Sequence, residues 1–218
     1  MPHKYDLIVF DWDGTLADSV KNIVDAIYCA SIDVGLEPPN DYDSRSIIGL
    51  ELTMAVHTLF PAAETAKVHK LAERYRHHYS EREHVIPLFE GVPESISELS
   101  GRGFHLAVAT GKGRGGLNRA LESSGLQQYF QASRCVDECF SKPHPQMLHE
   151  LMDEFGATPE RTLMIGDTSF DLQMAQNAVV AGLAVTYGAH PLDELQQHGP
   201  LACFDSFNKL HQWLKSNA

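Results

Sequence analysis

Four short motifs contain the residues whose types and spacing could do chemistry. Two carboxylates stand two residues apart in DWDGT and two stand four apart in GDTSFD, while VAT supplies a hydroxyl and SKP a lysine. The residues concerned are Asp11, Asp13, Asp167, Asp171, Thr110 and Lys142. Carboxylates, a lysine and a hydroxyl can together hold a divalent cation and a phosphoryl group. The motifs therefore indicate phosphate chemistry, provided that the fold brings them together.

Short apolar runs lie next to these motifs and predict the elements that position them. Such runs occupy 7–10, 105–110, 162–166, 183–187 and 201–204. An apolar run bounded by turn residues is typical of a strand buried on both faces. Helical patterns lie between the runs, which implies a parallel sheet sandwiched by helices. Because ligands of such a sheet bind beyond the carboxyl ends of its strands, we expect the motifs to converge on one edge.

A helical segment interrupts this alternation near the N-terminus. It contains no clear buried strand, and its helical patterns occupy 19–34, 51–59 and 62–82. We therefore predict an α/β protein with a Rossmann-like parallel sheet and an inserted all-helical domain. The predicted parts are a first core segment, a helical domain and the rest of the core, with the bounds 1–16, 17–87 and 88–218.

Four carboxylates at one edge of a sheet need positive charge beside them. Two unit charges about 4 Å apart repel by about 4 kcal/mol at an effective dielectric constant of 20. Lys142 offsets one negative charge, and a hard divalent cation would offset two more. Because the donor set is all oxygen, with no histidine or cysteine, it favours Mg²⁺.

A phosphoryl group would suit such a site. Asp11, at the end of the first predicted strand, would attack phosphorus and form an aspartyl-phosphate. Asp13, one strand period further on, could protonate the leaving oxygen and then accept a proton from the water that clears the intermediate. Lys142, Thr110 and backbone N–H groups of the turns would bind the phosphate oxygens.

The motifs DWDGTLADS, VATG, SKPHP and IGDTSFD, in this order, resemble those of the haloacid dehalogenase superfamily, and the phosphoglycolate-phosphatase-like hydrolases with a small helical cap most of all. The resemblance implies that the helical segment is a cap that closes over the site and excludes water. It also implies that Asp11 is the nucleophile and Asp13 the acid/base. Thr110 and Lys142 would bind phosphate, and Asp167 would bind the metal. Asp11 and the backbone carbonyl of Asp13 would complete the metal ligands. Asp171 would orient either metal-bound water or Lys142.

Four positions refine what this resemblance implies. Asp13 favours cleavage of a phosphate ester, because dehalogenases and phosphonatases of the superfamily lack that carboxylate. Ile23 stands where the related sugar-phosphate mutases carry a histidine, which disfavours a mutase. Gly111 replaces the usual asparagine of the second motif and leaves a backbone N–H to bind phosphate. Arg45 lies in SRSIIGL, which resembles the substrate-facing loop of the subfamily, and could pair with a carboxylate or second phosphate of the substrate.

The predicted function is therefore Mg²⁺-dependent hydrolysis of small phosphate monoesters by a phosphatase. A phosphosugar mutase or a pyrophosphatase of the same superfamily is the alternative. Less favoured are a dinucleotide-binding oxidoreductase, suggested by GKGRGG with Asp137 downstream, and a binding protein without catalysis. A zinc site formed by Cys135 and Cys139 with nearby histidines is also disfavoured, because the spacing fits no compact pattern.

Length and charge agree with an enzyme that acts on a small molecule. The chain has 218 residues, 43% of them hydrophobic, and 17 Lys and Arg against 29 Asp and Glu give a net charge of −12. That balance argues against nucleic acid or an anionic membrane as a partner. No apolar run approaches the roughly 20 residues of a membrane helix, and the first residues do not resemble a secretory signal. We expect a cytoplasmic monomer or homodimer whose partner is a small phosphorylated metabolite.

Overall fold

The computed structural model describes residues 3–83 and 86–218. Within these residues, one sheet of six parallel strands has the order β3-β2-β1-β4-β5-β6. The strands are β1 (Leu7–Phe10), β2 (His105–Thr110), β3 (Ala132–Cys135), β4 (Thr162–Gly166), β5 (Ala181–Val185) and β6 (Cys203–Phe204). In the centre, Phe10 at the end of β1 stands opposite Val108 of β2 and Ile165 of β4. The carboxyl ends of these three strands therefore meet at one edge, and the predicted fold class is confirmed.

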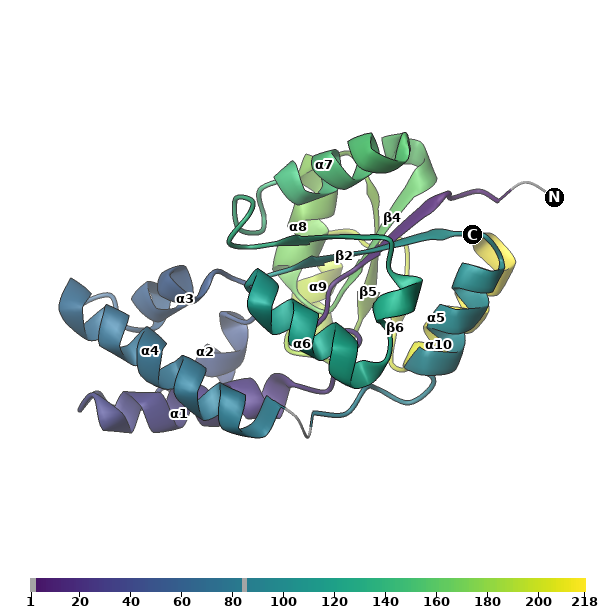
Figure 1. Ribbon diagram of the computed structural model, residues 1–218. Coiled ribbons are helices and arrows are strands. Elements are labelled where there is room, and N and C mark those ends of the chain that lie inside the picture. The colour runs from purple at the N-terminus through teal and green to yellow at the C-terminus, as the bar shows by residue number, and fades with distance from the viewer. Residues whose placement is uncertain (1–2, 84–85) are drawn as a thin grey trace.

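Helices cover both faces of the sheet (Figure 1). They are α5 (Val92–Gly101), α6 (Arg114–Ser124), α7 (Gln146–Phe155), α8 (Ser169–Asn177), α9 (Leu192–Gln196) and α10 (Phe207–Asn217). Ile8 and Phe10 belong to the apolar cluster shared with α5, α6 and α10, whereas Leu7 and Val9 belong to the one shared with α7 and α8. Successive residues of a strand face opposite sides, so a strand covered on both faces must be apolar throughout. This is why LIVF reads as an unbroken apolar run.

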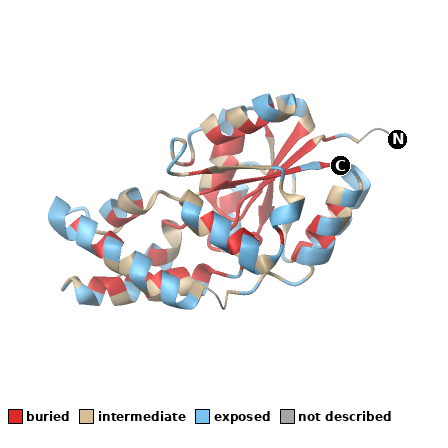
Figure 2. Cartoon of the chain, viewed as in Figure 1, coloured by how far each residue is buried: buried red, intermediate tan, exposed pale blue. Residues whose placement is uncertain are grey.

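Among the described residues between β1 and α5, four further helices form a bundle beside the sheet (Figure 1). They are α1 (Val20–Asp33), α2 (Asp41–Ser46), α3 (Leu52–Leu59) and α4 (Thr65–Arg82). Figure 2 shows buried stripes on these helices and exposed residues on their outer sides. Ile23, Ile27 and Ala55 are among the residues of their shared apolar cluster. The helices predicted at 19–34, 51–59 and 62–82 thus correspond to α1, α3 and α4.

Several predicted elements differ from the observed ones. Strand β5 occupies Ala181–Val185 rather than 183–187, and β6 is limited to Cys203–Phe204. The sequence analysis missed β3, an edge strand with the mixed sequence ASRC, and α2, whose residues DYDSRS have no apolar periodicity. Asn40, a residue type that favours helix N-termini, stands directly before α2 and was a usable signal. Its side chain caps the helix by accepting a hydrogen bond from the backbone N–H of Asp43.

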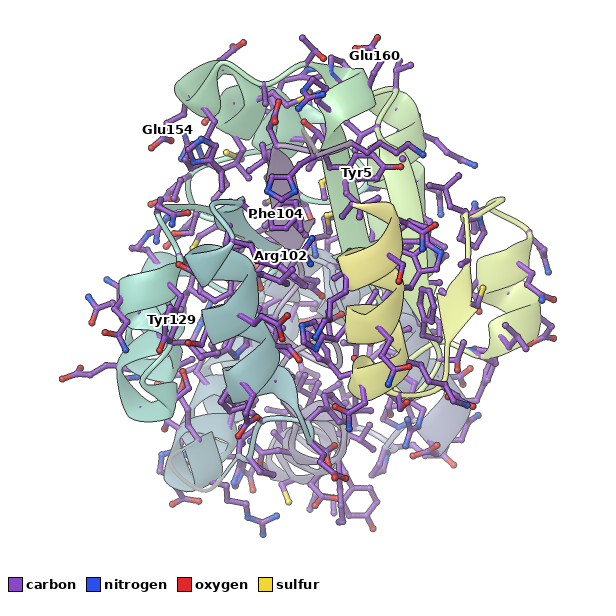
Figure 3. The ribbon with its side chains drawn as sticks, turned by 90° about the vertical axis from the view of Figure 1, so that its right-hand side faces the viewer. Tyr5, Arg102, Phe104, Tyr129, Glu154 and Glu160 are labelled. Atoms are coloured by element: carbon purple, nitrogen blue, oxygen red, sulfur yellow. The ribbon has the colours of Figure 1, made fainter. Side chains whose placement is uncertain are left out.

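Aromatic side chains close the core at the amino ends of the strands, opposite the edge that carries the motifs. Tyr5 precedes β1 and Phe104 precedes β2, and each is only 2% exposed. The Arg102 guanidinium lies over the Phe104 ring, 5.2 Å from its centroid (Figure 3). Among the helices of the described residues, we find none that is both long and apolar enough to cross a membrane.

Candidate active site

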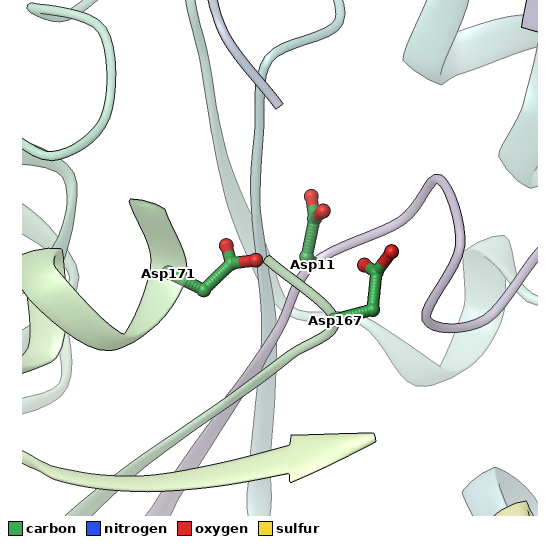
Figure 4. A group of neighbouring side chains, drawn as sticks. All are labelled: Asp11, Asp167 and Asp171. Carbon is green, nitrogen blue, oxygen red and sulfur yellow. The ribbon is translucent and has the colours of Figure 1, made fainter. Parts of the chain in front are cut away.

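Three buried carboxylates form the centre of the candidate site (Figure 4). Asp11 follows β1, Asp167 follows β4, and Asp171 lies in the first turn of α8. Each offers one carboxylate oxygen such that the three oxygens lie within 4.8 Å of one another. None of the three residues is more than 1% exposed. The convergence expected from the ends of parallel strands is thus present for these three residues.

Lys142 supplies the positive charge among these carboxylates. Its Nζ atom lies 2.8 Å from Oδ1 of Asp11 and 2.6 Å from Oδ1 of Asp171, and its side chain is fully buried. Burial alone would lower the pKa of Lys142, but the two carboxylates together raise it above its ordinary value. Lys142 thus places a positive charge between the two carboxylates and ties the end of β1 to the start of α8.

Hydrogen bonds fix the other two carboxylates. Asp167 accepts a hydrogen bond from the Thr15 hydroxyl at 2.7 Å and one from the backbone N–H of Ala189 at 2.8 Å. Oδ2 of Asp171 accepts hydrogen bonds from the Thr168 hydroxyl at 2.7 Å and from its backbone N–H at 3.1 Å. This is one half of a capping box at the N-terminus of α8. Both carboxylates are held rigidly before any ligand binds.

Glycines make room for these carboxylates. A Cβ atom on Gly14 or Gly188 would overlap the Asp167 carboxylate, and one on Gly166 would overlap the Asp171 side chain. Gly14 also has a φ of +80°, which suits glycine because it has no Cβ to clash in the left-handed region. The turn after β1 in DWDGT thus needs glycine for its backbone and for the space it leaves.

The site carries more negative charge than Lys142 can balance. Burial raises the pKa of Asp11 to about 7, and Lys142 opposes that rise only in part. Burial, and then Asp11 and Asp171, raise the pKa of Asp167 well above its usual range. Although Lys142 is its ion-pair partner, Oδ1 of Asp11 is a buried oxygen without a hydrogen bond of good geometry. The all-oxygen donor set and the excess charge fit a hard divalent cation.

The predicted ligand set used the carboxylates of Asp11 and Asp167 with the backbone carbonyl, not the carboxylate, of Asp13. Asp11 and Asp167 lie together as expected, and Asp171 joins them, whereas the Asp13 carboxylate does not belong to the group. Both oxygens of Asp171 are already engaged, one by Lys142 and the other by Thr168. This arrangement suits the predicted role of Asp171 in orienting Lys142.

The Asp13 carboxylate is instead held by two residues that the sequence analysis did not connect with it. The Nζ atom of Lys112 lies 3.1 Å from either carboxylate oxygen, and the Tyr79 hydroxyl donates to Oδ1 at 3.3 Å. Lys112 Nζ also donates to the Tyr79 hydroxyl oxygen at 2.7 Å. Burial, and then Asp13, raise the pKa of Tyr79 well above its usual value, so its hydroxyl remains a donor.

A cavity of about 440 Å³ lies between the sheet edge and the helical bundle. Asp11, Asp13 and Thr110 line its core side, and an apolar wall from the bundle includes Ile23 and Ile27. Other residues of that wall are Ile47, Ile48 and Ala55. Bound reactants would therefore meet the carboxylates on the core side and, on the bundle side, this apolar wall together with polar residues of α4 such as Arg76 and Tyr79.

The second motif and the bundle approach each other closely at this cavity. Gly111 lines the cavity, and a Cβ atom there would lie 2.6 Å from the carbonyl oxygen of Gly49. The buried Thr110 hydroxyl accepts a hydrogen bond from the backbone N–H of Lys112 at 3.2 Å. The position therefore admits glycine and no larger side chain while the bundle stands where it does.

Arg45 does not line this cavity. Its Nε atom pairs with Oδ2 of Asp41 at 2.8 Å, and its Nη1 atom donates to the Gly188 carbonyl at 3.5 Å. Arg45 belongs neither to the buried group of carboxylates with Lys142 nor to the cavity lining that includes the other predicted site residues, which are Asp13, Thr110 and Gly111. A substrate contact by Arg45 remains a prediction.

The alternative sites also have structural counterparts. The Asp137 carboxylate accepts from the backbone N–H of Arg114 at 3.0 Å and so occupies the N-terminus of α6, where a dinucleotide would place its pyrophosphate. Among the described residues, the carboxylate group around Asp11 is the one cluster of three or more side chains that could hold a metal, and it contains neither Cys135 nor Cys139. Neither the oxidoreductase nor the zinc alternative gains support.

Sequence reasoning missed Thr15, Tyr79 and the N–H of Ala189 as parts of the site. Thr15 follows DWDG directly, so its place in the first motif was a usable signal. Tyr79 and Ala189 are separated from any motif, and only the folded arrangement of α4 and of the loop after β5 brings them to the carboxylates.

Comparisons with known proteins agree with this geometry. The model of the family described as "Haloacid dehalogenase-like hydrolase" matches residues 8–185. A probable phosphatase, IndB, of Dickeya dadantii is 35% identical over 211 residues, which cover 94% of this chain and 91% of that protein. A phosphoglycolate phosphatase of Agrobacterium fabrum is 31% identical over 212 residues, with 94% and 90% covered. The crystal structure of a hydrolase from Pseudomonas syringae shares the fold, with a TM-score of 0.89 at 23% identity over 99% of each chain.

Proposed function

This chain belongs to the haloacid dehalogenase-like hydrolases, as the motifs predicted, and from that premise we propose that it is a phosphatase of small phosphate monoesters. The observation that carries the proposal is the position of Asp11. Asp11 directly follows β1 and lines the cavity, and its carboxylate lies 2.8 Å from the ammonium of the buried Lys142. A carboxylate so placed can attack a phosphoryl group whose ester part occupies the cavity.

Two carboxylates divide the chemistry. Asp11 attacks phosphorus through a carboxylate oxygen, an O–P bond forms, and the bond from phosphorus to the ester oxygen breaks. Asp13 gives its proton to that leaving oxygen and then takes a proton from the water that hydrolyses the aspartyl-phosphate. The separation of Asp13 from the acidic group supports this division, because Asp13 lines the cavity while its carboxylate contacts Lys112 and Tyr79 rather than the other carboxylates.

The phosphate oxygens need partners of positive or donor character. We assign this role to the Lys142 ammonium, the Thr110 hydroxyl and the backbone N–H of Gly111. A magnesium ion held by Asp11, Asp167 and the backbone carbonyl of Asp13 would neutralise negative charge on the phosphoryl group. Asp171 keeps Lys142 in place through its 2.6 Å contact.

Residues 17–87 then act as a cap over the core formed by residues 1–16 and 88–218. The apolar wall from α1 and α3 would exclude water and surround the ester part of the substrate. Ile23 belongs to this wall and has no group that transfers protons, which disfavours the mutase alternative. We place the enzyme in the cytoplasm, with a small phosphorylated metabolite as its substrate.

The test is release of inorganic phosphate by purified native chain and by Asp11→Asn, each with Mg²⁺ and with EDTA. The substrates are p-nitrophenyl phosphate, phosphoglycolate, sugar phosphates, nucleoside monophosphates and pyrophosphate. We expect Mg²⁺-dependent release by the native chain and background release by the variant. Asp153→Asn, an exposed change on α7, is the matched control and should keep native activity. Unimpaired release by a folded Asp11→Asn protein would refute the proposal, and a preference for pyrophosphate would favour the pyrophosphatase alternative.

A further inference from the structure

The cap contributes a side chain directly to the Asp13 carboxylate. Tyr79 lies in α4, is only 9% exposed, and donates its hydroxyl hydrogen to Oδ1 of Asp13 at 3.3 Å. Lys112 belongs to the core loop after β2 and lies 3.1 Å from the same carboxylate. Within the described part of the chain, these are the side chains that hydrogen-bond to the Asp13 carboxylate. One partner therefore comes from the core and the other from the cap.

Tyr79 is itself held in a defined orientation. Its ring stacks on that of Tyr75, with centroids 5.8 Å apart, and the ammonium of Lys112 lies 4.5 Å from the centroid of the Tyr79 ring. The same ammonium donates to the Tyr79 hydroxyl at 2.7 Å. The phenol is fixed by stacking, by a cation–π contact and by a hydrogen bond. Its hydroxyl therefore has a defined position and can set the orientation of the Asp13 carboxylate.

We propose that Tyr79 is a positioning residue that orients the Asp13 carboxylate for proton transfer to the leaving oxygen. The inference rests on the proposed function, in which Asp13 is the acid and then the base. Proton transfer needs the carboxylate within hydrogen-bond reach of the ester oxygen, and a freely rotating side chain would spend little time there. Because α4 belongs to the cap, the carboxylate reaches this orientation only when the cap stands over the core.

The test compares substrates that differ in how much they need an acid. A series of substituted phenyl phosphates keeps the shape of the ester nearly constant and varies the basicity of the leaving oxygen. A p-nitrophenolate leaves with little protonation, whereas a more basic phenolate or alkoxide needs the proton from Asp13. The quantity to measure is kcat/KM, because it includes steps only through formation of the aspartyl-phosphate and is unaffected by its later hydrolysis.

Tyr79→Phe removes one hydroxyl and keeps the ring and its stacking. We expect kcat/KM to fall about tenfold for the most basic leaving groups, a part of the 10²–10⁴ that acid catalysis contributes, and to change less than about twofold for p-nitrophenyl phosphate. Asp13→Asn should give the same steepened dependence to a larger degree, and Tyr79→Phe should steepen it no further in that background. Lys112→Met, from the core side of the cluster, should act in the same direction as Tyr79→Phe.

Tyr28→Phe is the matched control. It removes a hydroxyl from another helix of the cap, α1, where the side chain is exposed and does not line the cavity. We expect its dependence on the leaving group to equal that of the native enzyme. If Tyr79→Phe lowered kcat/KM equally for every ester, or not at all, the inference would be overturned. The proposed function would still stand in that case, provided that the native enzyme releases phosphate and Asp11→Asn does not. Absence of such release from the native enzyme would overturn both.

Discussion

Replacing Lys142 by methionine tests whether this lysine neutralises the site. The change keeps an unbranched chain of similar length and removes the charge. The native ammonium makes ion pairs of 2.8 and 2.6 Å with Asp11 and Asp171, and all three side chains are at most 2% exposed. Removing one partner of a buried ion pair typically destabilises a protein by 3–5 kcal/mol, because the remaining charge stays buried without compensation.

Two carboxylates lose their cation here, so we expect about 4–5 kcal/mol, the upper part of that range. For a chain of this length each kcal/mol lowers Tm by about 2–4 °C, which predicts a fall of about 8–20 °C. The assay is thermal unfolding followed by circular dichroism in EDTA, so that no added cation replaces the lysine. Adding Asp11→Asn to the Lys142→Met protein should restore part of the loss, because one of the two uncompensated carboxylates is then neutral.

The matched control is Lys209→Met. Lys209 pairs with Asp205 at 2.7 Å, but both side chains are 65% exposed. An exposed ion pair contributes at most about 1 kcal/mol, so its Tm should fall by no more than about 4 °C. A Lys142→Met protein whose Tm stays as close to the native value as that of the control would refute the view that Lys142 neutralises two buried carboxylates.

Two further predictions concern the metal site and a thiol. Mg²⁺ should raise the Tm of the native chain, because a Mg²⁺ concentration of 100 times the dissociation constant adds about 2.7 kcal/mol to the free energy of unfolding. Asp167→Asn should remove most of that increase in Tm, whereas Asp153→Asn should keep it. Equal Mg²⁺ shifts in native chain and Asp167→Asn would exclude Asp167 as a ligand. Burial raises the pKa of the Cys135 thiol to about 12, so iodoacetamide near pH 8 should leave it unmodified in the native chain and alkylate it in urea. Rapid labelling of native Cys135, read by peptide mass mapping, would contradict this burial.

The central strands and most of the site were predictable because their physical signals are local. A strand covered on both faces must be apolar at every position, so LIVF and TLMIG could be located without knowledge of their neighbours. Parallel strands then place whatever follows them at one edge, which is why Asp11 and Asp167 could be paired although 156 positions separate their numbers. Family membership was predictable for the same reason, since the motifs are the residues at those strand ends.

The contacts of Tyr79 and Arg45 depend on how the cap packs against the core. No local pattern in the sequence of the cap predicts that packing. Tyr79 is one of two tyrosines in the largely polar helix α4, and its contact with Asp13 follows from packing of α4 against α1 and the core. Arg45 lies on a short helix that the sequence analysis missed, so its pairing with Asp41 could not be foreseen. Motif spacing predicts what stands at a strand end but does not predict which side chain of a distant helix reaches it.

Gly111 shows why the core motifs and the cap have to be considered together. The resemblance leads one to expect asparagine after Thr110, and the structure gives a physical reason for glycine, because the Gly49 carbonyl oxygen lies 2.6 Å from where a Cβ atom would stand. Leu50 approaches the same point, its carbonyl oxygen lying 3.2 Å away. These neighbours are backbone atoms, which cannot turn aside as a flexible side chain could. With asparagine at this position, the backbone at Gly49 and Leu50 would have to move away from the second motif. Gly111 therefore has two consequences: no side chain contacts the phosphate at this position, and the Gly49 carbonyl oxygen can approach the second motif closely.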